Sequence, residues 1–556
     1  MVSITPTHQP RILPIMSAPS SHISRMFLVV LLLLQANVAV GAEKELKWQF
    51  VRSEHFTMLS ATNKTDSREL LMRLEQLRTM FLNALLKRRA REMPCTIVMF
   101  DTRSQFEPYM PLYKGKVKPV GGFFMPGRFG SHMAMSNEHY EHAARTIIHE
   151  YLHSLVGAYA PGIPVWLNEG LAELYETFSS EGDDVEVGRA HKGHLRTLSE
   201  SKWLPMEEFL KVTHGSPHYN ESDKISVFYA QSWLFTHYLI CGEFADKGAL
   251  GRFINASLDP DIPMARAFEE SFGMDYKTME RALKKYLRAG KHSVRRAKIP
   301  YAPILKKIEI TPADPIDAEL TTLYLKFRRH RDNGMAEQRL REILRTQPDN
   351  ARAHAFLYEV LLASSMPRRS ADGQAPARPT PDERRRMQEK RKLARQSLLR
   401  AVECKSDNAA VYAVLADEEF NRIDFHLGKF IKPDVSERLR GWLDHAIALD
   451  PDYLDAYNTL ALVEAFSEEF REDKWPSIIE AVKARRPLGR GWIGLAAMCW
   501  RFDEKEQCAE ILRRFKDAPS VDRRASRFAS AMLDECEGRV RKKSAKKMSV
   551  PAKPGE

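Results

Sequence analysis

The sequence predicts an α+β domain, built from a small mixed sheet and helices, followed by an all-α domain of helical repeats. Three observations lead to this prediction. Up to about residue 136, short apolar runs bounded by turn residues alternate with a helical pattern. From there to about residue 290 the pattern is helical throughout. After a break rich in Pro, Lys and Arg over 293–315, a short phrase recurs between amphipathic helices.

The first domain is expected to begin with strands at short apolar runs and one long helix. Strands are expected at 48–51, 55–59, 95–100, 121–124 and 132–136. The last two flank a turn at Pro126-Gly127, so they are expected to form a hairpin. Helices are expected over 66–88, over 138–157 and from Pro164 onward.

The recurring phrase of the second domain has three copies. Residues 346–354 (TQPDNARAH) return as 405–412 (KSDNAAVY) and 450–457 (DPDYLDAY), and each copy follows one amphipathic helix and opens another. This unit resembles the helix–turn–helix of tetratricopeptide repeats. The copies lie 58 and 45 residues apart, so the repeats are irregular. The first gap holds a stretch rich in Pro, Arg and Ser, 366–388, which is expected to be a disordered insertion.

The net charge of +12 raises the question of an anionic partner. The tail 537–556 carries +5 of this charge and residues 1–42 carry +2, which leaves +5 for residues 43–536. No interleaving of aromatic and basic residues marks a nucleic-acid groove. The pattern therefore indicates a solvated, disordered basic tail over 537–556 and no nucleic-acid partner.

The N-terminus predicts export. Arg25 precedes the apolar run Met26–Leu34, and Val40 and Ala42 stand at the −3 and −1 positions of a cleavage site. This run is shorter than the roughly 20 residues of a membrane span, so residues 1–42 are expected to be a cleaved signal peptide. An uncleaved N-terminal anchor is the alternative. No later segment is expected to cross a membrane, and the protein is expected in the periplasm or outside the cell. The six Cys form neither a disulfide framework nor a CxxC metal site, and they leave one or two bridges open.

The chemistry is expected at His149-Glu150-Tyr151-Leu152-His153. On a helix, residues four apart project from one face, so His149 and His153 can bind one zinc ion at about 2.0–2.1 Å. Glu150 lies beside such a metal rather than on it, where it can take a proton from zinc-bound water. Sixteen residues after His153 stands Glu169, in the phrase PVWLNEGLAE. A His₂Glu set would leave the fourth position open for water, and Gly170 would allow helices to approach closely.

This helix and the W-x-x-E-G-x-A-E phrase after it resemble the gluzincin arrangement of zinc peptidases. More narrowly, the stretch from Trp48 to about Tyr286 resembles the peptidase-MA-like family of predicted bacterial metallopeptidases. The shared features are Trp48 with the S-x-H-F strand 53–56, Gly122-Phe123, the phrase around Glu169 and the helix 229–233 (YAQSW). Such domains are often followed by tetratricopeptide-like repeats. The resemblance implies a zincin-like fold with His149, His153 and Glu169 as zinc ligands and Glu150 as the base.

The resemblance implies further roles. Tyr229 lies about as far after the ligand Glu169 as the oxyanion-binding tyrosine of gluzincin aminopeptidases, and His237 is an alternative donor. Glu173 is a rival of Glu169, but the motif assigns the ligand to Glu169 and leaves Glu173 to orient a ligand histidine. By the same analogy, the strand 132–136 is expected to be an edge that docks an extended peptide. The Gly-x-Met-Glu-Asn run of the large aminopeptidases is absent from the sequence, so aminopeptidase specificity is not supported.

The predicted organisation is a signal peptide at 1–42, a metallopeptidase domain at 43–295, a linker at 296–315, helical repeats at 316–536 and a tail at 537–556. The predicted function is zinc-dependent hydrolysis of peptides or proteins, with the repeats recruiting a substrate or partner protein. Two alternatives remain open. One is a peptidase fold that has lost activity and serves as a scaffold, and the other is a zinc hydrolase acting on another amide or ester.

Overall fold

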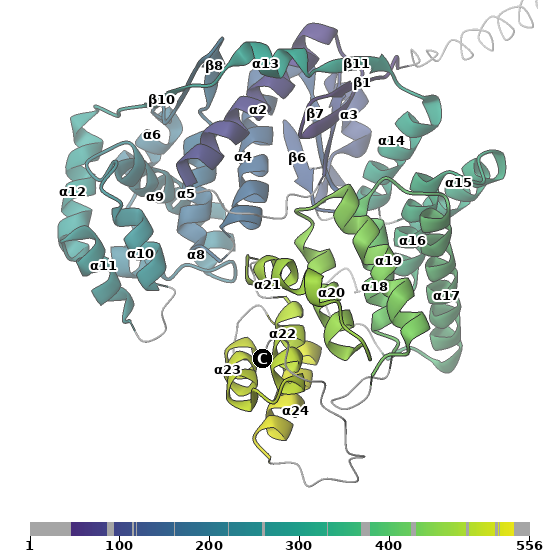
Figure 1. Ribbon diagram of the computed structural model, residues 1–556. Coiled ribbons are helices and arrows are strands. Elements are labelled where there is room, and N and C mark those ends of the chain that lie inside the picture. The colour runs from purple at the N-terminus through teal and green to yellow at the C-terminus, as the bar shows by residue number, and fades with distance from the viewer. Residues whose placement is uncertain are drawn as a thin grey trace, which may run out of the picture. The chain divides into compact units, whose positions relative to one another are not determined.

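The computed structural model describes residues 46–538, apart from 86–93, 114–115, 118, 161, 221, 258–261, 331, 368–377, 424–429, 485–488, 517–520 and 522. The predicted signal peptide and most of the predicted basic tail therefore lie outside the described residues. All elements below belong to one compact unit, Trp48–Glu556. It is a mixed α/β structure in which a small mixed sheet is followed by many helices (Figure 1).

The main sheet has six strands and places the predicted hairpin next to a central strand. Its order is β11 (Glu309–Pro312), β1 (Gln49–Arg52), β2 (Phe56–Ser60), β3 (Cys95–Phe100), β7 (Ser131–Ser136) and β6 (Gly122–Met125). The pairs β2–β3 and β3–β7 are parallel, and the other pairs are antiparallel. The expectation that strand 132–136 is an edge is wrong, because β7 pairs on both sides and its hairpin partner β6 forms the edge.

Alternating side chains of this sheet enter two different cores. On β3, Ile97 and Met99 pack into a large core with α2 (Lys64–Leu85) and α4 (Tyr140–Tyr159). Val98 and Phe100 point the other way, into a smaller core with α3 (Arg103–Phe106) and α14 (Pro315–His330). Because strand side chains alternate between faces, a strand buried on both sides must be apolar throughout. This explains the uninterrupted apolar run at Cys95–Phe100.

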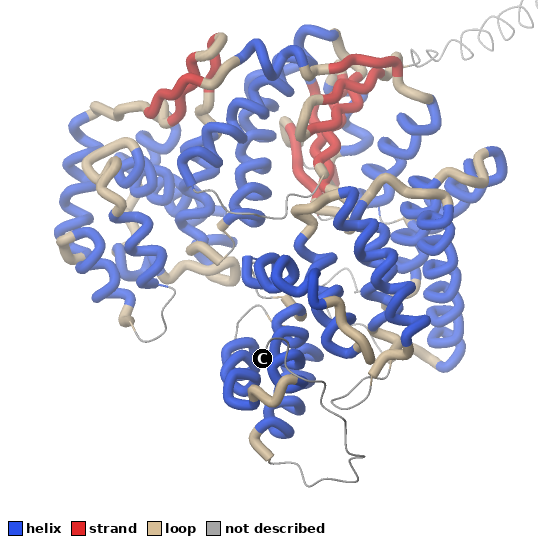
Figure 2. Tube along the Cα trace, viewed as in Figure 1, coloured by secondary structure: helices blue, strands red, loops and turns tan. Residues whose placement is uncertain are grey.

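The segment expected to be a linker is part of the folded structure. Within 296–315, β10 (Arg295–Lys298) pairs with β9 (Asp184–Val187), which pairs with β8 (Ser179–Glu181). These strands form the second sheet coloured in Figure 2. Further along, β11 closes the main sheet against β1. The predicted linker is therefore wrong, and so is the all-helical pattern up to 290. The remaining elements of this part are β4 (Leu112–Tyr113), β5 (Lys116–Val117), α5 (Val165–Tyr175), α6 (Lys192–Glu200), α7 (Met206–Leu210), α8 (Pro217–Asn220), α9 (Ser222–Ile240), α10 (Ala249–Ser257), α11 (Met264–Phe272), α12 (Tyr276–Ala289) and α13 (Tyr301–Lys306), together with the 3₁₀ turns Glu107–Tyr109 and Asn137–His139.

From α14 onward every described element is a helix. After α14 they are α15 (Asn333–Thr346), α16 (Ala351–Ser364), α17 (Pro381–Glu403), α18 (Ala409–Phe420), α19 (Pro433–Leu449), α20 (Leu454–Phe466), α21 (Trp475–Ala484), α22 (Gly491–Arg501), α23 (Lys505–Lys516) and α24 (Arg523–Cys536), together with the short 3₁₀ turn Glu472–Lys474. Two copies of the recurring phrase supply helix caps, because Asn350 and Asn408 accept hydrogen bonds from the first turns of α16 and α18. The third copy opens α20.

The prediction of a disordered insertion over 366–388 is wrong for residues 381–388. Residues 381–388 are the first turns of α17, where Pro381 occupies the first helical position and Thr380 and Glu383 form a capping box. Residues 368–377 lie outside the described part of the chain.

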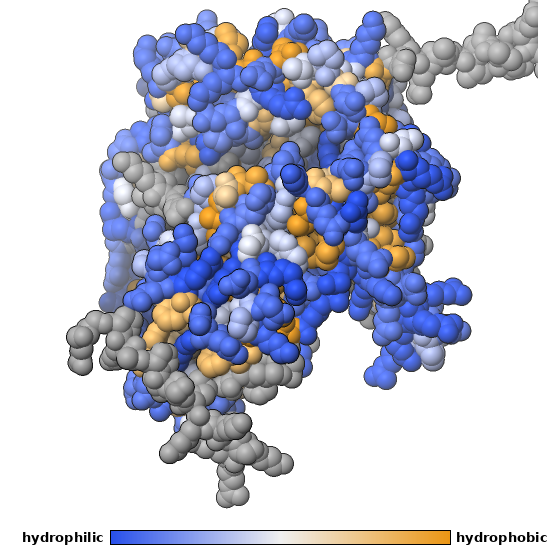
Figure 3. All heavy atoms as spheres, turned by 45° about the vertical axis from the view of Figure 1, so that its right-hand side comes forward, coloured by the Kyte–Doolittle hydropathy of each residue, from blue (hydrophilic) through white to orange (hydrophobic). Residues whose placement is uncertain are grey.

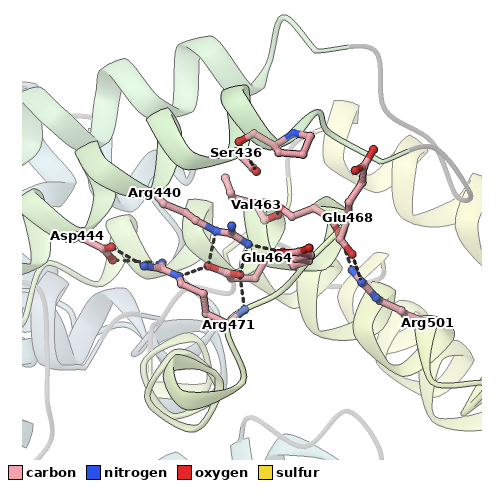
Figure 4. Close-up of polar contacts among 11 residues, drawn as sticks. Ser436, Arg440, Asp444, Val463, Glu464, Glu468, Arg471 and Arg501 are labelled. Carbon is pink, nitrogen blue, oxygen red and sulfur yellow. Dashed lines mark hydrogen bonds and ion pairs between the residues drawn. The ribbon is translucent and has the colours of Figure 1, made fainter. Parts of the chain in front are cut away.

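A buried carboxylate ties the later helices together (Figure 4). Glu464 on α20 is fully buried and receives two hydrogen bonds from Arg440 on α19, at 3.0 and 2.7 Å. Arg471 donates to the same carboxylate from its side chain and its backbone, and it also pairs with Asp444. Arg501 holds the carbonyl oxygens of the turn after α20. Since an unpaired buried carboxylate is strongly destabilising, this network fixes how α19 and α20 pack.

The turn between β6 and β7 contacts the helical part. Arg328 on α14 donates to the carbonyl oxygen of Pro126 at 2.9 Å, and Asn408 donates to that of Phe129 at 2.6 Å. The ring of His132 on β7 stacks on Tyr324 of α14, with centroids 4.2 Å apart.

Figure 3 shows a surface that is mainly hydrophilic, with separate hydrophobic patches. None of the described helices combines the length and apolarity that crossing a membrane requires.

Candidate metal centre

Two successive helices carry the predicted site. His149, Glu150 and His153 lie on α4, and Glu169 lies on α5. Between the helices, Pro164 is the N-cap residue of α5 and has a non-helical backbone, so the second helix begins directly after it. Almost every residue of α5 is buried, and Glu169 is only 2% exposed.

Gly170 explains how α5 reaches its position. A Cβ atom at this residue would lie 2.0 Å from Oγ1 of Thr236 and 2.4 Å from the carbonyl oxygen of Ser232, both on α9. Such distances are far below van der Waals contact, so only glycine permits this approach. The sequence analysis expected a close approach of helices here, and the structure identifies α9 as the partner.

The three predicted ligands come together. Nε2 of His153 lies 3.2 Å from Nε2 of His149 and 3.4 Å from Oε2 of Glu169, and Nε2 of His149 lies 3.8 Å from the same oxygen. Ligand atoms about 2.0–2.1 Å from a tetrahedral metal are separated by about 3.3 Å. The buried Oε2 of Glu169 has no hydrogen-bond partner among the described residues, which is costly unless a cation sits there. The three groups therefore fit a single metal ion.

The charges around His149 favour a cation. Burial alone would lower the pKa of His149, but the carboxylates of Glu176, Glu173, Glu150 and Glu169 outweigh it and raise this pKa to about 9. Burial would raise the pKa of the Glu169 carboxyl, yet His153, His149 and the hydroxyl of Tyr219 hold it below its ordinary value. Without metal the site thus holds a proton between imidazole and carboxylates, and a metal ion would replace that proton.

Side chains behind the ligands hold them in place. Nδ1 of His153 faces Oδ1 of Asn168 at 3.1 Å, which leaves Nε2 free for a metal. The hydroxyl of Tyr219 donates to Oε1 of Glu169 at 2.9 Å. Nδ1 of His149 lies 3.9 Å from Oε1 of Glu173 and 3.7 Å from Oε2 of Glu176. Glu173 therefore lies near the ligand histidine that it was expected to orient, and Glu176 shares that position.

Sequence reasoning missed three of these residues. Asn168 directly precedes the predicted ligand Glu169, and Glu176 lies one turn after Glu173, directly after the last residue of α5, so their spacing could have indicated them. Tyr219 lies in a polar stretch before α9, and nothing in its local sequence pointed to the site.

Two tyrosines lie beside the carboxylate of Glu169. The rings of Tyr219 and Tyr229 are stacked with centroids 6.2 Å apart. Burial, followed by the charge of Glu169, raises the pKa of both hydroxyls, to about 12 for Tyr219. Both therefore stay protonated at neutral pH and can donate a hydrogen bond. His237 lies apart in the core, where Nε2 faces the carbonyl oxygen of Gly188 and Nδ1 faces the hydroxyl of Tyr286.

A comparison with protein-family models finds no match to this chain, and a comparison with curated proteins finds none either.

Proposed function

We propose that this chain is a zinc-dependent peptide hydrolase whose metal is held by His149, His153 and Glu169. The observation that supports the proposal best is the mutual spacing of the three ligand atoms, 3.2, 3.4 and 3.8 Å, around a buried carboxylate oxygen without a partner among the described residues. Two imidazoles and one carboxylate are a ligand set of catalytic zinc sites. Glu169 is preferred to Glu173, whose carboxylate lies on the Nδ1 side of His149.

A zinc ion bound there would polarise a substrate carbonyl and lower the pKa of a water molecule. The residues of the chain supply the remaining steps. The carboxylate of Glu150 takes the proton of the attacking water and passes it to the leaving amine. Tyr229, with Tyr219 beside it, donates a hydrogen bond to the oxygen that gains negative charge in the transition state. Asn168 and Tyr219 keep His153 and Glu169 oriented throughout.

The edge strand β6 is the proposed docking site for an extended peptide. It packs against the helix that carries the histidines, because a Cβ at Gly122 would lie 3.1 Å from Cδ1 of Ile147 on α4. An edge strand has unpaired backbone groups that a peptide can extend by strand addition. The zincin-like character of this domain is part of the same proposal.

The helical part is proposed to recruit a protein substrate or partner. A cavity of about 750 Å³ is lined by the β6–β7 turn and by residues of the later helices. Its wall carries charges of both signs, including Arg128, Arg328, Asp417 and Glu418. Such a surface suits a polar peptide segment, as expected of tetratricopeptide-like repeats. Export by the N-terminal segment belongs to the same proposal, with an uncleaved anchor as the alternative.

The test compares Glu150→Gln with the parent protein and with Glu141→Gln, which changes an exposed carboxylate on the same helix. Each protein is analysed for bound zinc and incubated with a peptide library. We expect Glu150→Gln to keep its zinc and to lose hydrolysis by a factor of about 10²–10⁴, while Glu141→Gln keeps both. Equal cleavage by Glu150→Gln and the parent would refute the mechanism. Zinc binding without cleavage by the parent would favour the scaffold or a hydrolase for another amide or ester.

A further inference from the structure

A second group of potential metal ligands lies behind the first. Glu173 on α5 and His191 and His194 at the start of α6 each offer a ligand atom, and these atoms all lie within 4.8 Å of one another. None of the three belongs to the set His149, His153 and Glu169. We propose that Glu173, His191 and His194 bind a second divalent transition-metal ion such as zinc. This inference does not depend on the proposed function of the first site.

Two members of the second group, Glu173 and His194, already lie close together. Nε2 of His194 lies 2.7 Å from Oε2 of Glu173, and the rings of His191 and His194 stack with centroids 3.9 Å apart. A metal bound at about 2.0–2.1 Å to each donor would hold the donor atoms about 3.3 Å apart. Binding then needs a small separation of His194 and Glu173 and a change in the contacts of the His191 ring. A ligand set with two imidazoles and one carboxylate selects zinc-like ions over calcium or magnesium.

Glu173 can serve the second ion because His149 has another acceptor. The single N–H at Nδ1 of His149 needs one hydrogen-bond partner, and two carboxylates face it at similar distances, 3.9 Å for Glu173 and 3.7 Å for Glu176. Glu176 can therefore keep His149 oriented while Glu173 binds the second ion. These two roles give a reason for two carboxylates one turn apart, Glu173 on α5 and Glu176 directly after its last residue.

His191 sets the affinity of the second site. Its Nδ1 accepts the backbone N–H of His194 at 3.1 Å and so caps α6. A neutral imidazole that accepts at Nδ1 carries its proton at Nε2. The ring must therefore give up this cap before it can bind a metal. The second ion is accordingly expected to bind more weakly than the first.

Charged side chains of both signs surround the second group. His191 lines a cavity of about 460 Å³, whose wall also contains Glu141 and the cationic residues Arg73, Arg145, Arg189 and Lys192. Arg73 is paired with Glu141 at 3.3 Å and Arg189 with Glu186. Burial, followed by the charges of His194 and Arg145, lowers the pKa of His191, and the charges of Glu176 and Glu173 oppose this effect. The two carboxylates therefore attract a cation and Arg145 repels it, which is a second reason for weaker binding than at the first site.

The test is a metal titration of the chelator-treated full chain, with zinc content and chelator competition as readouts. We expect the parent to bind two equivalents with separate affinities. The variant His191→Ala/His194→Ala should lose only the weaker equivalent, and His149→Ala/His153→Ala should lose only the tighter one. His142→Ala, which removes an exposed histidine of α4, should keep both.

One equivalent in the parent that persists in His191→Ala/His194→Ala would overturn the inference and leave the proposed function standing. Two equivalents in that variant, or loss of both in His149→Ala/His153→Ala that remains folded, would also overturn it. Conversely, if His149→Ala/His153→Ala kept every equivalent while the other variant lost one, the second site would stand and the proposed function would fail. Because the parent stoichiometry is measured without substitution, a parent that binds no zinc, or one equivalent that His149→Ala/His153→Ala loses, decides against the inference even when His191→Ala/His194→Ala does not fold.

Discussion

Replacing Gly170 by alanine tests the link between helix packing and the metal ligands. The new Cβ would lie 2.0 Å from Oγ1 of Thr236 and 2.4 Å from the carbonyl oxygen of Ser232. The threonine side chain can rotate, but the backbone oxygen cannot, so α5 and α9 must move apart. Glu169 precedes Gly170 in the chain, so this movement also displaces the proposed ligand.

Two opposing effects set the magnitude. Alanine is favoured over glycine in a helix interior by about 1 kcal/mol. Overpacking of a filled core costs about 1–3 kcal/mol, and occasionally more. Since the overlap involves backbone and exceeds that of an ordinary extra methyl group, the upper end applies. We therefore expect Gly170→Ala to lower the free energy of unfolding by about 2 kcal/mol and to weaken metal binding.

The assay is urea unfolding followed by circular dichroism, together with a metal titration. The matched control is Gly157→Ala on α4, where no described atom lies within 4 Å of the added Cβ. The control should gain up to about 1 kcal/mol, because only helix propensity changes. Adding Thr236→Ala to Gly170→Ala should restore part of the loss, since the Ser232 oxygen remains. A Gly170→Ala protein as stable as the parent would refute the close approach of α5 and α9.

Three further outcomes are expected. Tyr219→Phe should weaken zinc binding about 10–100-fold, because it removes a hydrogen bond to a proposed ligand. Chelator competition measures the zinc affinity. An unchanged affinity would show that the Tyr219 hydroxyl does not help Glu169 to bind zinc. The Sγ atoms of Cys508 and Cys536 lie 2.9 Å apart, so oxidised glutathione should convert the two thiols to a disulfide. The disulfide should raise the free energy of unfolding by about 3 kcal/mol. Peptide mapping of the oxidised protein should show the disulfide-linked peptide pair, and Cys508→Ser should not give it. Burial lowers the pKa of His237 to about 4, from 6.5. The unfolded state then binds more protons, so stability present above pH 6.5 should fall by about 3 kcal/mol as the pH drops towards 4. His237→Gln should flatten that part of the curve of unfolding free energy against pH.

The elements that the sequence predicted well are those with a local signature. The apolar run Cys95–Phe100 became a central strand, and the hairpin partners β6 and β7 were recognised from their turn. Likewise, His149 and His153 share one helix face whatever the tertiary structure, and Glu169 stands in a distinctive phrase. For these residues, spacing along the chain is nearly equivalent to spacing in the structure.

Most of the failures depended on a partner far away in the sequence. The strand Arg295–Lys298 contains three basic residues and looks like a linker, and it is a strand only because β9 pairs with it. Which strand of the hairpin forms the edge depends on which of the two, β6 or β7, pairs with β3. Tyr219 reaches Glu169 across 50 positions of the chain. The start of α17 is an exception, because its signals are local: Pro381, a residue typical of breaks, begins the helix behind the capping box of Thr380 and Glu383.

The pairing of β1 with β11 has a consequence for how the chain is made. Gln49 lies opposite Pro312, so the outermost strand of the main sheet is one of the last parts of this region to be synthesised. Until residue 312 has left the ribosome, β1 exposes an unpaired edge, and closing so long a loop is entropically slow. Nascent chains truncated before β11 should therefore be more sensitive to proteases and more prone to associate through β1 than chains extended just beyond it. The main sheet is thus complete only after β11 has been synthesised and has paired with β1.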